Sequence, residues 1–427
     1  MEFFAFIGRN VRWLAGGFLL CFFSSFGQTF YISLSNGDIR HEYGLSNGQF
    51  GLIYMAGTLA SAATLPTLGW LLDRYPAWRV ASVTIVCLAA ATLAMAFSTS
   101  LPFLFVSIYL LRLFGQGMMT EISMTTTGRW FAANRGRAMA ITTLGLHAGT
   151  GLLPLVFVFV SAALGWRGTW IAGATVLGVV ALPAIVWSTF RERDPQSEVK
   201  GRPAPAVRDW TLREVLRSPV FWLINASVLA PPFIGTTIFF HQVYLTHLRG
   251  WSIEVFASGF AVMSATTVVF SLLCGSLIDR FTAVRILPFF LIPMAISCLV
   301  AGTFTAEASI FVFMTFLGIS NGLSSTLLGA LWPELYGVKH LGQVRSVIVA
   351  LMVLSSAIGP GVTGVLIDWN VSYPLQIEAM GLYCVGMTAI MTLLAARLAP
   401  KVAATPLHAA PGAGRAVDRL DPDPDRP

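Results

Sequence analysis

Apolar runs of about 20 residues recur along the whole chain, and this recurrence constrains the fold more than any other feature. A run of that length is what an α-helix needs to cross the hydrocarbon core of a bilayer. Six such runs precede a polar break and six follow it, so we expect twelve membrane-spanning helices. The expected spans are 13–35, 48–70, 80–98, 102–126, 138–162, 168–190, 219–242, 254–275, 285–303, 308–330, 344–366 and 373–397.

The composition agrees with an all-α integral membrane protein. Of the 427 residues 56% are hydrophobic and 11% charged, whereas a soluble domain carries about 25% charged residues. The formal net charge of +7 comes from basic residues scattered between apolar runs, which offer no basic face to nucleic acid. The five cysteines lie inside apolar runs, and no metal-site spacing, phosphate-binding glycine pattern or nucleophile constellation is visible. We therefore expect no cofactor, no metal and no enzyme activity.

The polar break divides the chain into parts. We expect an N-terminal six-helix half at 1–190, a linker at 191–218, a C-terminal six-helix half at 219–399 and a tail at 400–427. The linker is charged and rich in proline, with a short surface helix expected at 209–217. The tail is rich in Pro and Asp and low in hydrophobicity, so it is expected to be disordered.

The Lys and Arg residues are distributed unevenly across the expected spans. If the N-terminus is inside, nearly all 27 lie on the cytoplasmic side. The exceptions are Arg40, Arg167 and Arg249 outside and Arg112 within a span. This asymmetry fits the positive-inside rule. We expect a multi-pass protein of the cytoplasmic (inner) membrane with both termini in the cytoplasm.

An internal repeat links the two halves. GWLLDRYPAWR at 69–79 returns as GSLIDRFTAVR at 275–285, which is 206 positions later. Further pairs at the same offset are His41 and His247, Gly44 and Gly250, Ser46 and Ser252, and Pro154 and Pro360. Two halves related by a parallel repeat are typical of transporters with a central site between the halves. Such a site can open alternately to either side of the membrane.

These motifs resemble those of the major facilitator superfamily, and the resemblance covers essentially the whole chain apart from the tail. The family's loop signature is Gly, three residues, Asp, a basic residue and later basic residues. It corresponds here to Gly69, Asp73, Arg74 and Arg79, echoed by Gly275, Asp279, Arg280 and Arg285. The family usually has a second Gly where this chain has Pro76 and Thr282.

Two further segments extend the resemblance. YLLRLFGQGMMT at 109–120 is similar to a second family signature, an Arg followed by a Gly-rich turn. TLREVLRSPVFWLI at 211–224 resembles bacterial relatives of the monocarboxylate and oxalate–formate carriers. Those carriers typically hold an Arg in the eighth helix for the substrate carboxylate, but the run at 254–275 contains none.

The resemblance assigns a conformational role to the loop signature. In the family, its Asp latches the cytoplasmic ends of the halves together when the carrier faces outward. By resemblance, Asp73 would meet the start of the eleventh helix near 343–346, and Gly69 would allow the two helices to approach closely. An Asp suits this role because it accepts hydrogen bonds from free N–H groups at a helix N-terminus.

Arg112 is the main candidate for contact with substrate. It lies near the middle of its expected helix, where a charged residue is costly and is functional by default. The alternative is a structural Arg whose guanidinium is satisfied by backbone carbonyls. Gln116 lies one turn away on the same face, whereas Glu121, nine residues on, falls on the opposite face of an α-helix. The resemblance ties this Arg to proton coupling or to holding an anion.

Other polar residues within the spans complete the candidate site. His147 reaches a depth comparable to that of Arg112 and either carries a proton or packs as a hydrogen-bonded side chain. Gln28 and Asn321 either line the cavity or join helices by hydrogen bonds. The prolines at 230–235 should break the seventh helix and free carbonyls for a cavity.

Together these features predict a secondary transporter that works by alternating access as a monomeric unit in the lipid bilayer. The expected cargo is a small organic anion resembling a monocarboxylate, taken up with protons, because Arg112 has no clear acidic partner within the membrane. Export of drugs or metabolites by proton antiport is the alternative. A membrane sensor would need an added signalling domain and a membrane enzyme would need clustered acids or histidines, and the sequence shows neither.

Overall fold

The computed structural model describes residues 2–131, 135–191, 209–337 and 340–403, and every regular element in these ranges is helical. Up to residue 191 the elements are α1 (Glu2–Phe23), η1 (Ser24–Gly27), α2 (Thr29–Ile32), η2 (Ser33–Ser35), α3 (Asn36–Tyr43), α4 (Asn47–Leu68), α5 (Leu71–Arg74), α6 (Ala77–Ala96), α7 (Leu101–Leu110), η3 (Leu111–Met119), α8 (Thr120–Trp130), α9 (Arg135–Val176), η4 (Leu177–Ala181) and α10 (Leu182–Thr189). From residue 209 they are α11 (Leu212–Arg217), α12 (Pro219–Val228), α13 (Ala230–Phe240), α14 (Gln242–Arg249), α15 (Ile253–Phe281), α16 (Ala283–Ile286), η5 (Leu287–Phe289), α17 (Ile292–Thr303), α18 (Ser309–Tyr336), α19 (Leu341–Asp368) and α20 (Tyr373–Ala403).

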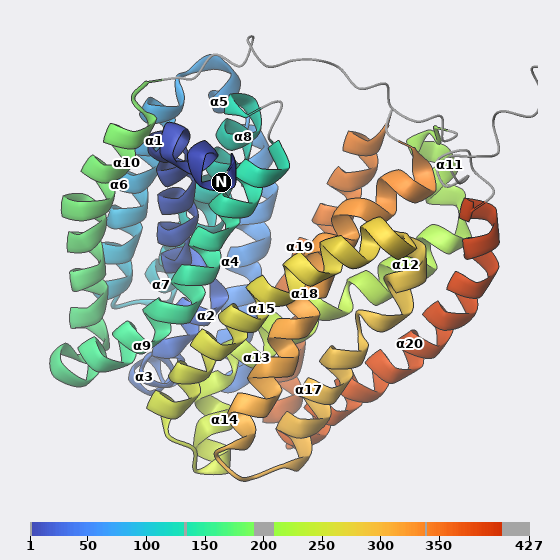
Figure 1. Cartoon of the computed structure of the whole chain (residues 1–427). Helices are drawn as coiled ribbons and strands as arrows, with labels where there is room; N and C mark the ends of the chain where they lie inside the picture. The colour runs from blue at the N-terminus through green and yellow to red at the C-terminus, as the bar shows by residue number, and fades with distance from the viewer. Residues whose placement is uncertain (1, 132–134, 192–208, 338–339, 404–427) are drawn as a thin grey trace, which may run out of the picture.

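Most of these helices are suited to a membrane. Within the described ranges, ten helical stretches are long and apolar enough to cross a bilayer, and a pair bent by 45° at residue 28 brings the number to eleven. The longest stretch, Gly136–Thr189, has 54 residues and includes Gly165, whose φ of 69° and ψ of 170° are not helical. Figure 1 shows the chain reversing direction within this stretch, at the lower left, before it runs up to the label α10.

The connecting segments differ partly from expectation. The surface helix expected at 209–217 starts later, at Leu212, because Thr211 and Glu214 form a capping box that fixes the helix start. The tail expected to be disordered lies outside the described residues from 404 onward, and 400–403 belong to α20.

The helices form two groups that lean against each other. Figure 1 shows α1, α6 and α10 on the left and α12, α17 and α20 on the right, with the groups spread apart at the top and meeting below. The lower meeting place, where α3 packs beside α14, is called the closed end. The upper end, where α5, α8 and α11 lie, is called the linker end.

Glycines bring α4 and α19 into contact near the closed end. A Cβ on Gly51 would lie 2.6 Å from the carbonyl oxygen of Pro360, and one on Gly364 would lie 2.6 Å from that of Asn47. The fully buried residues of α4 all lie between Asn47 and Ser61, and the remainder of this helix toward the linker end is half-buried or exposed. The two groups therefore pack together at one end of the molecule.

The repeat seen in the sequence recurs in two turns at the closed end. Gly44 ends α3 with φ of 63°, and Gly250 ends α14 with φ of 66°. These left-handed conformations favour glycine because it has no Cβ. In both turns the serine two positions later, Ser46 or Ser252, caps the next long helix. The offset of 206 residues thus corresponds to the same local structure.

Candidate functional site

Arg112 lies in η3, a π-helical segment in the middle of the span formed by α7, η3 and α8. Its side chain is only 2% exposed and points to the break between η1 and α2. Nη1 donates hydrogen bonds to the carbonyl oxygen of Gly27 at 3.2 Å and to Oγ1 of Thr29 at 3.3 Å. A π-helical segment inside a span is often found at a functional site.

Tyr54 of α4 completes the surroundings of this guanidinium. The ring centroid of Tyr54 lies 5.4 Å from Cζ of Arg112, a cation–π arrangement. The Tyr54 hydroxyl donates to Oγ1 of Thr29 at 2.7 Å, so both side chains meet at the same threonine. Arg112 is therefore held by two other spans of its own group.

The charge of Arg112 is not matched by a carboxylate. Among the described residues the ion pairs are Arg129–Asp73 and Arg167–Glu42, and Nε of Arg112 is buried without a hydrogen-bond partner. A buried unpaired cation is costly, because the partners present are neutral dipoles. The arrangement suits the reception of an anion.

Gln28 and Gln116 both lie near Gly27, whose carbonyl Arg112 contacts. Gln28 follows the carbonyl that Arg112 contacts, and the backbone of Gln116 approaches Gly27 so closely that a Cβ there would lie 2.7 Å from its nitrogen. Both side chains are half-buried, and no side-chain hydrogen bond is formed by either within the described ranges. Their amides are therefore free to bind a ligand.

His147 and Asn321 lie on other helices. His147 is one turn before Gly151 on α9, and a Cβ on Gly151 would lie 3.3 Å from Ser264 of α15 in the other group. Asn321 of α18 lies between Gly318 and Gly322, which pack against the same helix α15. Both side chains are half-buried, and within the described structure no hydrogen bond connects either to Arg112.

The first copy of the loop signature lies at the linker end and is engaged within its own group. Asp73 forms an ion pair with Arg129 of α8, and Nη1 of Arg129 also donates to the Leu72 carbonyl at 2.5 Å. Arg74 lies 6.0 Å from the Trp70 ring, and Arg79 lies 5.2 Å from the Trp78 ring.

The close helix approach expected at Gly69 is not present in this conformation. A Cβ there would meet only the carbonyl oxygen of Pro66, at 3.6 Å. The start of α19, the expected partner of Asp73, exposes Gln343, Arg345 and Ser346. The latch is therefore not made here.

The second copy of the signature spans the end of α15 and the start of α16. Gly275 and Asp279 belong to α15, Arg280 lies 5.2 Å from the Phe281 ring, and Arg285 is exposed on α16. Between the helices, Thr282 adopts φ of 75° and ψ of 154°, a conformation that normally requires glycine. Thr282 stands where the loop signature of the major facilitator superfamily usually has its second Gly.

At the closed end, polar side chains that sequence reasoning missed join the two groups. Asn36 donates to the carbonyl of Phe240 at 2.8 Å, and Gln242 donates to that of Phe30 at 2.9 Å. Ser33 donates to the Phe239 carbonyl at 2.6 Å and accepts from Gln242 at 2.9 Å. Asn36 and Gln242 stand 206 positions apart, so the repeat offset was the signal that could have identified them.

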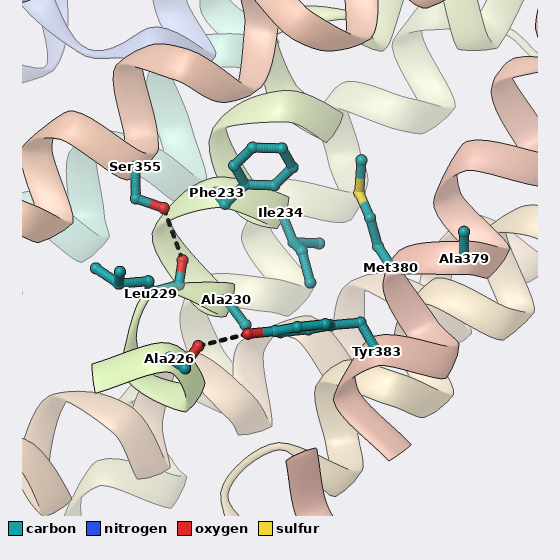
Figure 2. A pocket seen from close by; sticks show the side chains of 9 residues that line it. All are labelled: Ala226, Leu229, Ala230, Phe233, Ile234, Ser355, Ala379, Met380 and Tyr383. Carbon is teal, nitrogen blue, oxygen red and sulfur yellow. Dashed lines mark hydrogen bonds between the residues drawn. The ribbon is translucent and has the colours of Figure 1, made fainter. Parts of the chain in front are cut away.

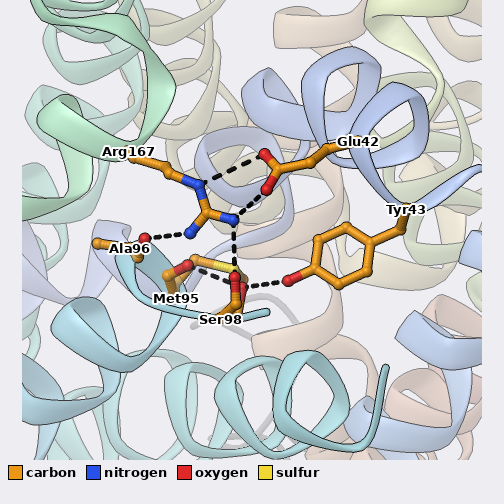
Figure 3. Close-up of polar contacts among 6 residues, drawn as sticks. All are labelled: Glu42, Tyr43, Met95, Ala96, Ser98 and Arg167. Carbon is orange, nitrogen blue, oxygen red and sulfur yellow. Dashed lines mark hydrogen bonds and ion pairs between the residues drawn. The ribbon is translucent and has the colours of Figure 1, made fainter. Parts of the chain in front are cut away.

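A separate network braces the first group at the same end. Figure 3 shows Arg167 paired with Glu42 and donating to the carbonyls of Ala96 and Ser98. The Tyr43 hydroxyl donates to Ser98 at 2.7 Å. These bonds tie α3, the end of α6 and the start of the sixth expected span together without reaching the other group.

In the seventh span α12 ends at Val228 and α13 starts at Ala230, so the interruption is a single residue, Leu229, whose φ of −76° and ψ of −17° remain helical. The nearby carbonyls do not open onto a central cavity: Tyr383 donates to Ala226 at 2.8 Å and Ser355 donates to Leu229 at 3.0 Å. Figure 2 shows these bonds in an apolar pocket of about 400 Å³ between α12–α13, α19 and α20.

Comparisons with a family model and with individual proteins agree on one family. The model described as Major Facilitator Superfamily matches residues 17–270 and 233–419. The probable sulfoacetate transporter SauU of Cupriavidus necator is 25% identical, over 86% of this chain and 90% of that protein. The oxalate:formate antiporter of Oxalobacter formigenes is 25% identical, over 58% of this chain and 57% of that protein.

The fold also matches a solved transporter structure. A bacterial homologue of the human lysosomal transporter Spinster, in an inward-facing and unoccupied conformation, has a TM-score of 0.69. It is 17% identical, and the match covers 91% of this chain and 97% of that one.

Proposed function

The chain belongs to the major facilitator superfamily and is a membrane transporter, and from this premise we propose that it takes up a small organic anion together with protons. The proposed cargo class is monocarboxylate-like. Transport proceeds by alternating access in a monomer that needs no cofactor.

The observation that carries the proposal is the unpaired charge of Arg112. The guanidinium is buried against Gly27, Thr29 and Tyr54, none of which carries a negative charge. An anion would neutralise it, and Gln28 and Gln116 offer amide donors nearby. Two similar proteins are named for small anions, sulfoacetate in one case and oxalate and formate in the other.

Twelve spans in two six-helix halves fit the helices best. The 54-residue stretch of α9 to α10 is about 80 Å long at 1.5 Å per residue, well beyond one bilayer core. Its break at Gly165 supports two spans, which with the bent first span gives twelve. We assign 1–190 and 219–399 to the halves and 191–218 to a cytoplasmic linker.

The structure fits one state of the alternating-access cycle. The two groups are bonded at the closed end and spread at the linker end, and the positive-inside rule supports a cytoplasmic linker end. This corresponds to an inward-facing carrier in an inner membrane. In the outward-facing state, Asp73 would leave Arg129 for the start of α19.

His147 is the proposed proton carrier, because its half-buried imidazole lies where α9 meets α15 across the halves. Asn321 of α18, between two glycines that pack against α15, is the proposed polar residue of the substrate path. Both proposed roles, proton carrier for His147 and lining residue for Asn321, are based on where the residues lie in the helix packing.

Uptake by the purified protein in proteoliposomes tests this function. The liposomes are given an inward proton gradient and labelled formate, oxalate or sulfoacetate. We expect uptake of at least one anion, an initial rate at least tenfold lower in Arg112→Gln, and an unchanged rate in the control Arg213→Gln, since Arg213 is exposed on α11. No transport of any organic anion, or full activity of Arg112→Gln, would refute the proposal.

A growth experiment with cells that make the protein distinguishes uptake from export by proton antiport. Cells making the protein should grow better on an organic acid if it is an importer. Better survival with toxic apolar compounds, without an advantage on organic acids, would instead support export.

A further inference from the structure

The spans Asn47–Arg74 and Leu341–Asp368 form a matched antiparallel pair across the two groups. Each has 28 residues, and each carries an aspartate at its C-terminal end, Asp73 or Asp368. The start of the first span lies beside the end of the second, because a Cβ on Gly48 would touch Val365 and Asp368. Asp368 is thus placed at the N-terminus of the partner span, and Asp73 ends the first span on the side where the second span begins.

Asp368 is bonded to that N-terminus in this structure. Its Oδ2 accepts a hydrogen bond from Oγ of Ser46 at 2.6 Å and another from the backbone nitrogen of Gly48 at 2.9 Å. Ser46 is the N-cap of α4, so the carboxylate meets free backbone donors and the positive end of the helix dipole. These bonds join the two groups at the closed end.

At the linker end of the same helix pair, the aspartate is not bonded to the partner helix. Asp73 is paired with Arg129 of its own group, and the first turn of α19 exposes Gln343 and Ser346. The linker end therefore holds a carboxylate on one group and an exposed helix start on the other, the two components that Asp368 and α4 bring together at the closed end. One end of the helix pair is therefore latched while the other is free.

We propose that Asp368 is the closed-end latch of this transporter and the counterpart of Asp73 on the same helix pair. The carboxylate of Asp368 holds α4 while the linker end is open. When the halves rock, Asp368 releases α4 and Asp73 exchanges Arg129 for the N-terminus of α19. The inference rests on the proposed alternating access and is independent of the identity of the cargo or the coupling ion.

Distances between spin labels at both ends of the purified full chain test this latch. Ser100 and Ser372, exposed on opposite groups, report the closed end, and Tyr75 and Ser276 report the linker end. Labels are attached through cysteines in a Cys87→Ser background, because the other four native cysteines are buried. The distance distributions give the ratio of molecules open at each end.

Asp368→Asn should raise the fraction open at the closed end about tenfold, as for the loss of a hydrogen bond to a charged group. The same variant should shorten the distances at the linker end. Asp73→Asn should shift both ends in the reverse direction, and the double variant should return near the wild-type ratio. Asp368→Glu, which keeps the charge, should retain most of the closed-end population.

Glu42→Gln is the matched control. It removes a carboxylate at the same end, but one that is paired with Arg167 inside a single group, so the distributions should not change. If Asp73→Asn moves both ends and Asp368→Asn moves neither, the latch is refuted and alternating access stands. If neither end changes in any variant or with any added anion, alternating access fails as well.

Discussion

Thr282 occupies a backbone conformation that a β-branched residue rarely adopts. Its φ of 75° and ψ of 154° occur in the junction between α15 and α16. Holding a non-glycine residue there costs about 1–3 kcal/mol, although a glycine loses more entropy on folding. The strain lies in the second copy of the loop signature, far along the chain from Arg112.

We predict that Thr282→Gly stabilises the protein by about 1 kcal/mol, because the strain relieved exceeds the entropy lost. The thermal unfolding midpoint of the purified protein should rise. The matched control is Pro76→Gly at the equivalent position of the first copy, where φ is −62° and suits proline, so this variant should lower the midpoint. A lower midpoint for Thr282→Gly would contradict the strain argument.

At single residues, the sequence identified a charge more readily than its partners. Arg112 was evident because an arginine inside an apolar run is rare. Its contacts with Thr29 and Tyr54 could not be predicted, since hydroxyl groups occur in most of the spans and only packing brings these two together. Likewise, the Asp73–Arg129 pair depends on which conformation the carrier adopts.

Among the elements, η3 shows where periodicity reasoning breaks down. Glu121 falls opposite Arg112 only if the fourth span has 3.6 residues per turn throughout. Residues 111–119 instead form a π-helix with i→i+5 hydrogen bonds, so the phase carried past Met119 does not follow the α-helical count. Glu121 is exposed and accepts a hydrogen bond from Thr125, so its environment is polar rather than a buried face.

The contact between η1 and η3 depends on paired glycines. A Cβ on Gly27 would lie 2.7 Å from Cα of Gly115 and would also collide with the Leu111 carbonyl. Because the colliding atoms belong to the backbone, they cannot move away without shifting a span. The same contact places the Gly27 carbonyl on Arg112, so the packing of these elements and the site are linked.

We predict that Gly27→Ala destabilises the protein by about 2 kcal/mol or more through overpacking, and that it abolishes anion transport. Thermal unfolding and proteoliposome uptake measure the two effects. Gly235→Ala in α13 is the control, because nothing lies within 4 Å of the added Cβ and alanine favours a helix. A Gly27→Ala protein with normal stability and uptake would show that the backbones are not in contact.

For the whole molecule, the helical class and the approximate positions of the spans were more predictable than the state in which they pack. Apolar run length and the 206-residue offset indicate the spans and the matching turns at Gly44 and Gly250. Which end is closed depends on weak contacts between the halves, such as those of Asn36 and Gln242. A carrier must be able to break these contacts, so its sequence has to be compatible with closure at either end and does not by itself indicate which end is closed.

The closed end depends on backbone contact between α4 and α19 as well as on hydrogen bonds. Gly51 is the most direct probe, since its added Cβ would meet the Pro360 carbonyl at 2.6 Å and Cα of Gly361 at 3.2 Å. Both atoms belong to the other half, so the collision exists only while the closed end is closed. A half that folds alone would not feel the added methyl group.

We therefore predict that Gly51→Ala opens the closed end while lowering the thermal midpoint less than Gly27→Ala does. Spin labels at Ser100 and Ser372 should show longer distances, and uptake should fall because the inward-facing state is visited less often. Gly57→Ala is the matched control on the same helix, because its Cβ would meet Ile108 at 3.1 Å within its own half. Equal distance distributions for Gly51→Ala and the wild type would mean that the halves do not touch at α4 and α19. A shift in Gly51→Ala but not in Gly57→Ala would show that the halves separate between these two helices.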